Sequence, residues 1–121
     1  MEKIVTNQVI CSSDRNLKEN VNDIHFSILN KLNNIKEKAF NFKDDADKRT
    51  VYGIIAQDVQ KAGLDELVHV KDDGTLGVDY TSYLILKIAK LEKDNSALIN
   101  AIVELGKKVK ELEDKTNDKN D

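Results

Sequence analysis

The chain has 121 residues, a length that favours a single domain. Its 22 acidic residues slightly outnumber its 19 basic ones, and a net charge of −3 with mixed signs argues against a protein that binds nucleic acid or an anionic membrane. The absence of proline permits long helices, and the single Cys11 excludes an internal disulfide.

The N-terminal third predicts one strand and two helices. Residues 3–11 are rich in β-branched side chains, which favours an extended strand. Asn16 followed by Glu19 resembles a capping box and predicts a helix start. A second helix is predicted, with Asn22 or Asp23 as its cap, from apolar residues spaced along one helical face: Ile24, Ile28, Leu29, Leu32 and Ile35.

The middle of the chain predicts two hairpins separated by a short helix. Residues 38–43 and 50–53 read as strands on either side of a charged loop, 44–49. Residues 54–62 form an amphipathic pattern that ends at Gly63, a glycine suited to a helix C-terminus, and we expect Ile54, Ile55 and Val59 in the core. The second hairpin is predicted around Asp72-Asp73-Gly74, between residues 67–70 and 76–80.

From Thr81 onward the sequence predicts one long helix with a heptad seam. Its apolar positions alternate at spacings of four and three residues over four heptads, which is typical of a coiled coil. Asn95 at an a position favours two strands, whereas Ile85 and Ile99 at e positions favour three or more, so the pattern leaves dimer and trimer open. The seam consists of Leu84, Ile88, Leu91, Asn95, Leu98, Ile102, Leu105, Val109 and Leu112.

Several of these segments, in this order, resemble a known family. They are similar to the C-terminal intramolecular chaperone and self-processing domain of phage tail spikes, tail fibres and neck appendages, also called peptidase S74. The segments that carry the resemblance are Ser13-Asp14, Leu17-Lys18-Glu19-Asn20-Val21, Phe40-Asn41-Phe42, Gly53-Ile54-Ile55-Ala56-Gln57-Asp58-Val59, Leu67-Val68, Asp73-Gly74-Thr75-Leu76, Val78-Asp79-Tyr80 and the heptad helix.

The resemblance implies a fold and an assembly state. It implies an α+β protein, with a small helix-and-hairpin globular part followed by a long coiled-coil helix, assembled as a homotrimer. Its partner would be an N-terminal passenger, a fibrous or β-helical stalk of the same polypeptide. On this basis we expect four segments: the end of the passenger at 1–12, the globular part at 13–80, the coiled coil at 81–114 and a frayed tail at 115–121.

The resemblance also implies a self-cleaving peptidase that acts once, on its own chain. The scissile bond would join Ser12 to Ser13, the reacting pair would be Ser13 and Lys18, and Asp14 would support them. No cofactor, metal, nucleic acid or membrane is expected. Cleavage would take place in the host cytoplasm during virion assembly, leaving the passenger in the virion tail and releasing the chaperone.

The proposed chemistry places a condition on the fold. A serine hydroxyl needs a base, and lysine serves as one when burial or cationic neighbours favour its neutral form. Residues five apart do not face each other on a continuous helix. Either Ser13 therefore lies in an extended segment before the helix, or Lys18 meets the Ser13 of a neighbouring chain.

Other candidate sites favour simpler interpretations. His25 and His69 lack acidic or cysteine neighbours at ligand spacing, and Asp44-Asp45 and Asp72-Asp73-Gly74 lack the alternating ligands of a calcium loop. Two alternatives to the self-cleaving chaperone stay open: a trimerisation module that remains permanently attached to its fibre protein, and an unrelated coiled-coil adaptor.

Overall fold

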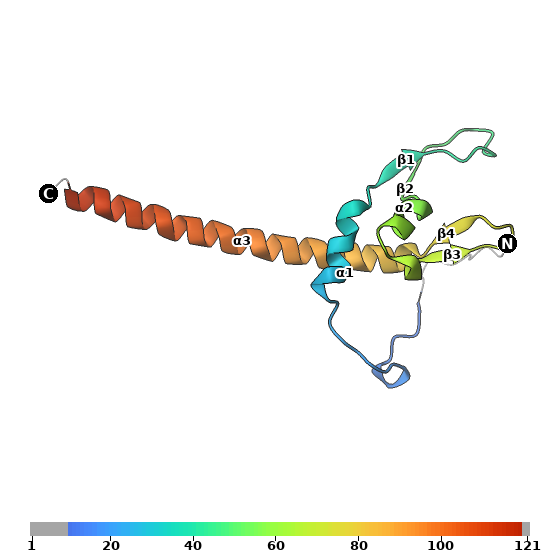
Figure 1. Ribbon diagram of the computed structural model, residues 1–121, viewed down its shortest axis with the longest axis horizontal. Coiled ribbons are helices and arrows are strands. Elements are labelled where there is room, and N and C mark those ends of the chain that lie inside the picture. Colours follow the sequence, from blue (N-terminus) through green and yellow to red (C-terminus); the bar gives the residue numbers. More distant parts are fainter. Residues whose placement is uncertain (1–9, 120–121) are drawn as a thin grey trace.

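One long helix projects from a small head built of short helices and two hairpins (Figure 1). The structure is a computed structural model and describes residues 10–119. It confirms the expected α+β class. In chain order the elements are η1 (Arg15–Leu17), α1 (Phe26–Lys31), η2 (Leu32–Asn34), β1 (Lys38–Phe40), β2 (Val51–Gly53), α2 (Ala56–Lys61), η3 (Asp65–Leu67), β3 (Val68–Val70), β4 (Leu76–Val78) and α3 (Tyr80–Lys119).

Both predicted hairpins are present, each as a separate two-stranded antiparallel sheet. Strand β1 pairs with β2 with Ala39 opposite Tyr52, and β3 pairs with β4 with His69 opposite Gly77. At the β3–β4 turn Gly74 has a φ of 85°, and the Asp73 carboxylate accepts a hydrogen bond from the Thr75 amide at 2.9 Å. The left-handed conformation of Gly74 and the hydrogen bond of the Asp73 side chain explain why the sequence predicted this turn correctly.

The loop at the tip of the β1–β2 hairpin is held by one carboxylate. Asp45 accepts hydrogen bonds from the Asp47 and Arg49 amides, each at 3.1 Å, and forms an ion pair with the Arg49 guanidinium. The Arg49 side chain, as the foremost cause, holds the pKa of Asp45 below its ordinary value. The charged loop expected at 44–49 is therefore an ordered connection.

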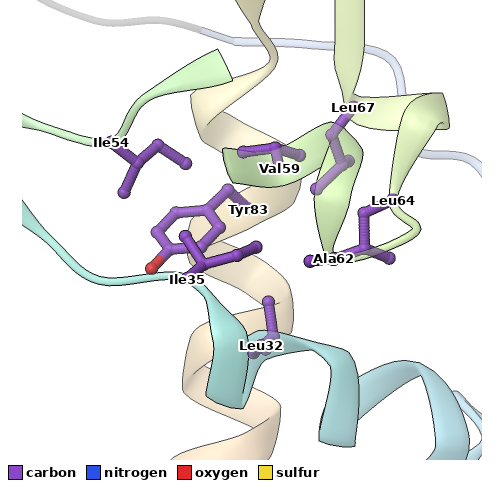
Figure 2. Close-up of a cluster of buried hydrophobic side chains, with 8 residues drawn as sticks. All are labelled: Leu32, Ile35, Ile54, Val59, Ala62, Leu64, Leu67 and Tyr83. Carbon is purple, nitrogen blue, oxygen red and sulfur yellow. The ribbon is translucent and has the colours of Figure 1, made fainter. Parts of the chain in front are cut away.

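The core lies where α2, η2 and the start of α3 meet (Figure 2). Helix α2 ends as predicted, because Gly63 has a φ of 83° and its amide donates to the Gln60 carbonyl at 2.9 Å. Tyr83 brings α3 into the core and is only 3% exposed. The core consists of Leu32, Ile35, Ile54, Val59, Ala62, Leu64, Leu67 and Tyr83.

Two expectations about this region were wrong in detail. Ile55 is 37% exposed, whereas its neighbour Ile54 is buried. The Ile55 side chain lines an open groove together with Phe42 and Leu76. Helix α1 begins at Phe26, and its cap is His25, whose ring Nδ1 accepts a hydrogen bond from the Ser27 amide at 3.2 Å. Asn22 and Asp23 lie before this start, in a segment without regular structure.

Helix α3 starts at a capped junction beside the second hairpin. The Asp79 carboxylate accepts hydrogen bonds from the Ser82 amide at 3.1 Å and the Ser82 hydroxyl at 2.8 Å, and these bonds lower the pKa of Asp79. Asp at this position is a favoured helix cap, which satisfies a backbone donor that the helix itself leaves unpaired. The Asp79 amide donates to the Leu67 carbonyl at 2.8 Å, so the same residue also fixes the helix to η3.

Helix α3 runs into the segment 115–121 that the sequence assigned to a tail, and fraying of that tail stays a prediction. The helix includes residues 115–119, because neither proline nor glycine interrupts it after Gly106. The expected strand at 3–11 falls largely outside the described residues, and Ile10 and Cys11 have no regular structure. Within the described part of the chain no helix is long and apolar enough to span a bilayer.

A contact that the sequence did not predict joins the end of β2 to the start of α3, at Gly53 and Tyr80. The Ile54 amide donates to the Tyr80 hydroxyl at 3.1 Å, and that hydroxyl donates to the Ile54 carbonyl at 3.4 Å. A Cβ atom on Gly53 would overlap the Tyr80 hydroxyl and crowd the Phe40 ring. Position 53 is therefore a glycine, because the hydroxyl of Tyr80, the first residue of α3, occupies the space that a side chain at position 53 would need.

We predict that Gly53→Ala destabilises the head by about 2 kcal/mol, since overpacking a fixed contact costs about 1–3 kcal/mol. Thermal unfolding at fixed protein concentration measures the loss. In a Tyr80→Phe background, which removes the overlapping hydroxyl, the same substitution should cost much less. An equal cost in both backgrounds would show that the tyrosine is not the obstacle.

Candidate functional site

Ser13 and Lys18 lie together in a single exposed turn. The Lys18 ammonium Nζ donates to the Ser13 Oγ at 2.8 Å, within one chain. Between them η1 forms one turn of 3-10 helix, and both flanking residues, Asp14 and Lys18, have extended backbone angles. Ser13 therefore precedes the turn in an extended segment, which is the first of the two arrangements that the spacing allowed.

The turn differs from the helix expected at Asn16. Asp14 is its cap: the carboxylate Oδ1 accepts from the Asn16 amide at 2.9 Å, and the turn ends at Leu17. Lys18 has an extended backbone, which ends the turn before Glu19, and Asn20 then has a left-handed φ of 53°, which a helix does not accommodate. The capping-box pattern was misleading because Asp14 accepts the hydrogen bond from the Asn16 amide, which Glu19 would accept in a capping box.

The site is open to solvent on this chain. Ser13, Arg15, Lys18 and Val21 line a depression of about 250 Å³. Every residue from Ile10 to Ser27 is exposed, including the apolar Leu17, Val21 and Ile24. The Ser12–Ser13 bond is thus accessible, and the described part of the chain buries neither member of the pair.

The heptad seam forms the second candidate site. Helix α3 turns Tyr83 and Leu86 toward the core, while Leu84 and Ile88 remain exposed on another side of the helix. The apolar seam residues, from Leu84 to Leu112, are 53% to 66% exposed. An exposed apolar stripe of this kind, interrupted at Asn95, on a helix of 40 residues, about 60 Å long at 1.5 Å per residue, is typical of an interaction surface.

The seam helix is tied to the head through Glu37. Its carboxylate Oε1 accepts from the Tyr83 hydroxyl at 2.8 Å and forms an ion pair with Lys87 Nζ at 2.9 Å. The hydrogen bond from Lys87, followed by that from Tyr83, lowers the pKa of Glu37 to about 2. Burial and the neighbouring Glu37 carboxylate raise the pKa of the Tyr83 hydroxyl. Residues 46 positions apart thus fix the first hairpin to α3.

The low Glu37 pKa predicts a loss of stability in acid. A carboxyl whose pKa falls from 4.5 to about 2 on folding stabilises the folded state above pH 4.5, and this contribution disappears between about pH 4.5 and 2. Because the Glu37 side chain is 55% exposed, we expect a solvent-screened effect of about 1 kcal/mol or less. Thermal midpoints of wild type and Glu37→Gln should differ at pH 6 and converge near pH 2. The exposed Glu111→Gln is the control, and a constant difference at all pH values would contradict the assignment.

The two histidines have ordinary structural surroundings. His25 caps α1 and stacks near Phe26, with ring centroids 4.4 Å apart, and His69 lies in β3. Among the described residues no group of three or more His, Cys, Asp or Glu side chains is arranged to hold a metal ion. Cys11 is exposed next to the proposed cleavage site.

These features define an α+β module with an exposed Ser–Lys pair near one end and a long helix with an exposed apolar seam at the other. Residues 13–69 match the family Peptidase_S74, described as chaperone of endosialidase. This matched segment contains the Ser–Lys turn, both strands of the first hairpin, α2 and most of β3, and it supports the resemblance to that family of chaperones. No curated protein matches the chain.

The match covers part of the resemblance seen in the sequence. It begins at Ser13, the residue after the proposed scissile bond, and ends at His69. Val78-Asp79-Tyr80 and the heptad helix lie beyond it. Sequence reasoning missed Gly53 and Tyr80 as a contacting pair, and missed Glu37 altogether. The glycine before an apolar helical segment was the available signal for the first, whereas no local signal marks Glu37.

Proposed function

We propose that this module trimerises through α3, templates the folding of a passenger that precedes Ser13 in the same polypeptide, and then releases itself by cutting the Ser12–Ser13 bond. The passenger class implied by the resemblance is a tail spike, tail fibre or neck appendage. Processing would take place in the host cytoplasm during virion assembly. The single observation that carries the proposal is the 2.8 Å contact between Lys18 Nζ and Ser13 Oγ directly after that bond, in a segment that matches the chaperone family.

The proposed reaction needs two steps and one water. Neutral Lys18 accepts the Ser13 hydroxyl proton while Oγ attacks the Ser12 carbonyl carbon. The C–N bond breaks, the Ser13 nitrogen takes a proton, and the Ser12 acyl group is now an ester on Oγ. Water then hydrolyses the ester, which leaves a carboxylate on Ser12 and restores the Ser13 hydroxyl. Each chain therefore reacts once.

Assembly would control the first step. A lysine amine becomes a base when it is desolvated or lies near other cations, but Lys18 is exposed on the single chain. We propose that neighbouring chains, brought together by the seam, or the folded passenger cover the turn and exclude water from it. Cutting would then follow folding in time, so that the chaperone leaves only after its work is complete.

The intrachain contact predicts that each chain cuts itself. A Ser13→Ala chain that keeps Lys18 can be coexpressed with a Lys18→Ala chain that keeps Ser13, each with its own tag. If the pair acts within one chain, neither should be cut in mixed assemblies. Wild type mixed with Ser13→Ala should give cut wild-type chains beside uncut variant chains. Mass spectrometry of the purified mixed assemblies reads the result, and cleavage of the Lys18→Ala chain in the first mixture would show that the lysine acts between chains.

If the wild-type precursor assembles but is never cut, the module is a permanent trimeriser of its fibre protein. The uninterrupted seam supports that function equally well, because it does not depend on Ser13 or Lys18. The unprocessed mass of the assembled wild-type chain is the observation that would favour it.

A further inference from the structure

The turn that joins Ser13 to Lys18 is held almost entirely by its own hydrogen bonds. The Leu17 amide donates to the Asp14 carbonyl, and the Lys18 amide donates to the Arg15 carbonyl, each at 3.0 Å. The Asp14 carboxylate adds the bond from the Asn16 amide at 2.9 Å. No residue of η1 is buried, so packing against the rest of the described chain contributes little.

Among these bonds only one uses a side chain. The two backbone bonds form in any residue sequence that adopts the turn, whereas the third requires an acceptor at position 14. A side-chain acceptor at a helix cap contributes about 1 kcal/mol, a large share of the stability of a single isolated turn. The population of the turn, and with it the approach of Lys18 to Ser13, should depend on this acceptor.

We infer that Asp14 is a positioning residue for self-cleavage: its carboxylate sets the turn that carries the Lys18 amine to the Ser13 hydroxyl. This inference rests on the proposed function. Within the described residues the Asp14 carboxylate makes no hydrogen bond to Ser13 or Lys18, so it acts through the backbone and exchanges no proton with the reacting pair.

A positioning role differs from an electrostatic one in what can replace Asp14. Asparagine and serine also accept a hydrogen bond at a cap, and asparagine does so about as well as aspartate. If the carboxylate instead acted by its charge beside Lys18, asparagine would fail and the pH dependence of cutting would move. Glu19 provides the matched control, because it is an exposed carboxylate one residue after Lys18.

The test compares first-order cleavage rates of precursors that retain residues 1–12, measured from pH 6 to 9. We expect Asp14→Ala to cut about fivefold to tenfold more slowly, with an unchanged pH profile, as loss of a cap worth about 1 kcal/mol predicts. Asp14→Asn and Glu19→Ala should cut at close to the wild-type rate. Equal slowing in Asp14→Asn and Asp14→Ala, a shifted pH profile in Asp14→Asn, or full activity in Asp14→Ala would each overturn the inference.

The same assay separates this inference from the proposed function. Wild-type cleavage before Ser13 that is abolished in Ser13→Ala supports the function whatever Asp14 does. Absence of wild-type cleavage overturns the function and the Asp14 inference with it. Sedimentation of every variant checks that it assembles. Slow cutting by an assembled Asp14→Ala chain, with recovery in Asp14→Asn, is then an effect on the turn and not on folding.

Discussion

Replacing Ser13 with alanine is expected to abolish cleavage of the precursor and leave its fold and assembly intact. The substitution removes the attacking Oγ, and the exposed side chain contributes nothing to the core. Lys18→Arg should have the same effect, because a guanidinium stays protonated and cannot take the serine proton. Lys18→Ala should also be inactive. Losses of at least about a thousandfold are typical when a member of a reacting serine–base pair is removed.

Time courses resolved by gel and intact mass measure these losses. Arg15→Lys is a control for disturbance of the turn, since it changes a neighbouring side chain while keeping its charge. Undiminished cleavage in Ser13→Ala would rule out the mechanism. A Lys18→Arg precursor that is cut at the wild-type rate would show that another group acts as the base.

Charged substitutions in the seam are expected to dissociate the assembly and to stop cutting even though Ser13 and Lys18 remain. Leu98→Glu combined with Ile102→Glu would bury unpaired like charges between the helices, at a cost of several kcal/mol for each chain. Glutamate is a good helix former, so the substitutions act on association and leave the propensity of α3 nearly unchanged. Sedimentation equilibrium at micromolar concentration should show a trimer for wild type and a monomer for the variant.

The matched control places the same charges on another side of the helix. Asn100→Glu with Lys107→Glu lies outside the a and d positions and should leave both assembly and cutting intact. A wild-type monomer at micromolar concentration would refute the seam as an assembly surface. Full-rate cutting by the dissociated Leu98→Glu/Ile102→Glu variant would refute control of cleavage by assembly.

The hairpins, α2 and the helical C-terminal region could be predicted because their signals are local. Asp73-Gly74 sets its own turn, Gly63 ends its own helix, and the heptad pattern identifies an exposed apolar stripe. The number of chains that bury this stripe depends on contacts between copies. The resemblance implies three chains.

Contacts over long sequence separations escaped prediction. Tyr80 bonds to Ile54 across 26 residues, and Tyr83 bonds to Glu37 across 46, so no short pattern records either pair. The start of α1 was placed too early because Ile24 continues the apolar spacing yet precedes the helix. At the Ser–Lys site the spacing left two arrangements open, and the single chain adopts the intrachain contact on a 3-10 turn capped by Asp14.

Native mass spectrometry of the processed wild-type protein tests the central claim most directly, because it reads the assembly and the cut together. The account predicts a complex of three identical chains that each begin at Ser13, and a Ser13→Ala complex of three chains that each retain residues 1–12. A wild-type complex whose chains keep residues 1–12, or whose new N-terminus is any residue other than Ser13, would contradict it.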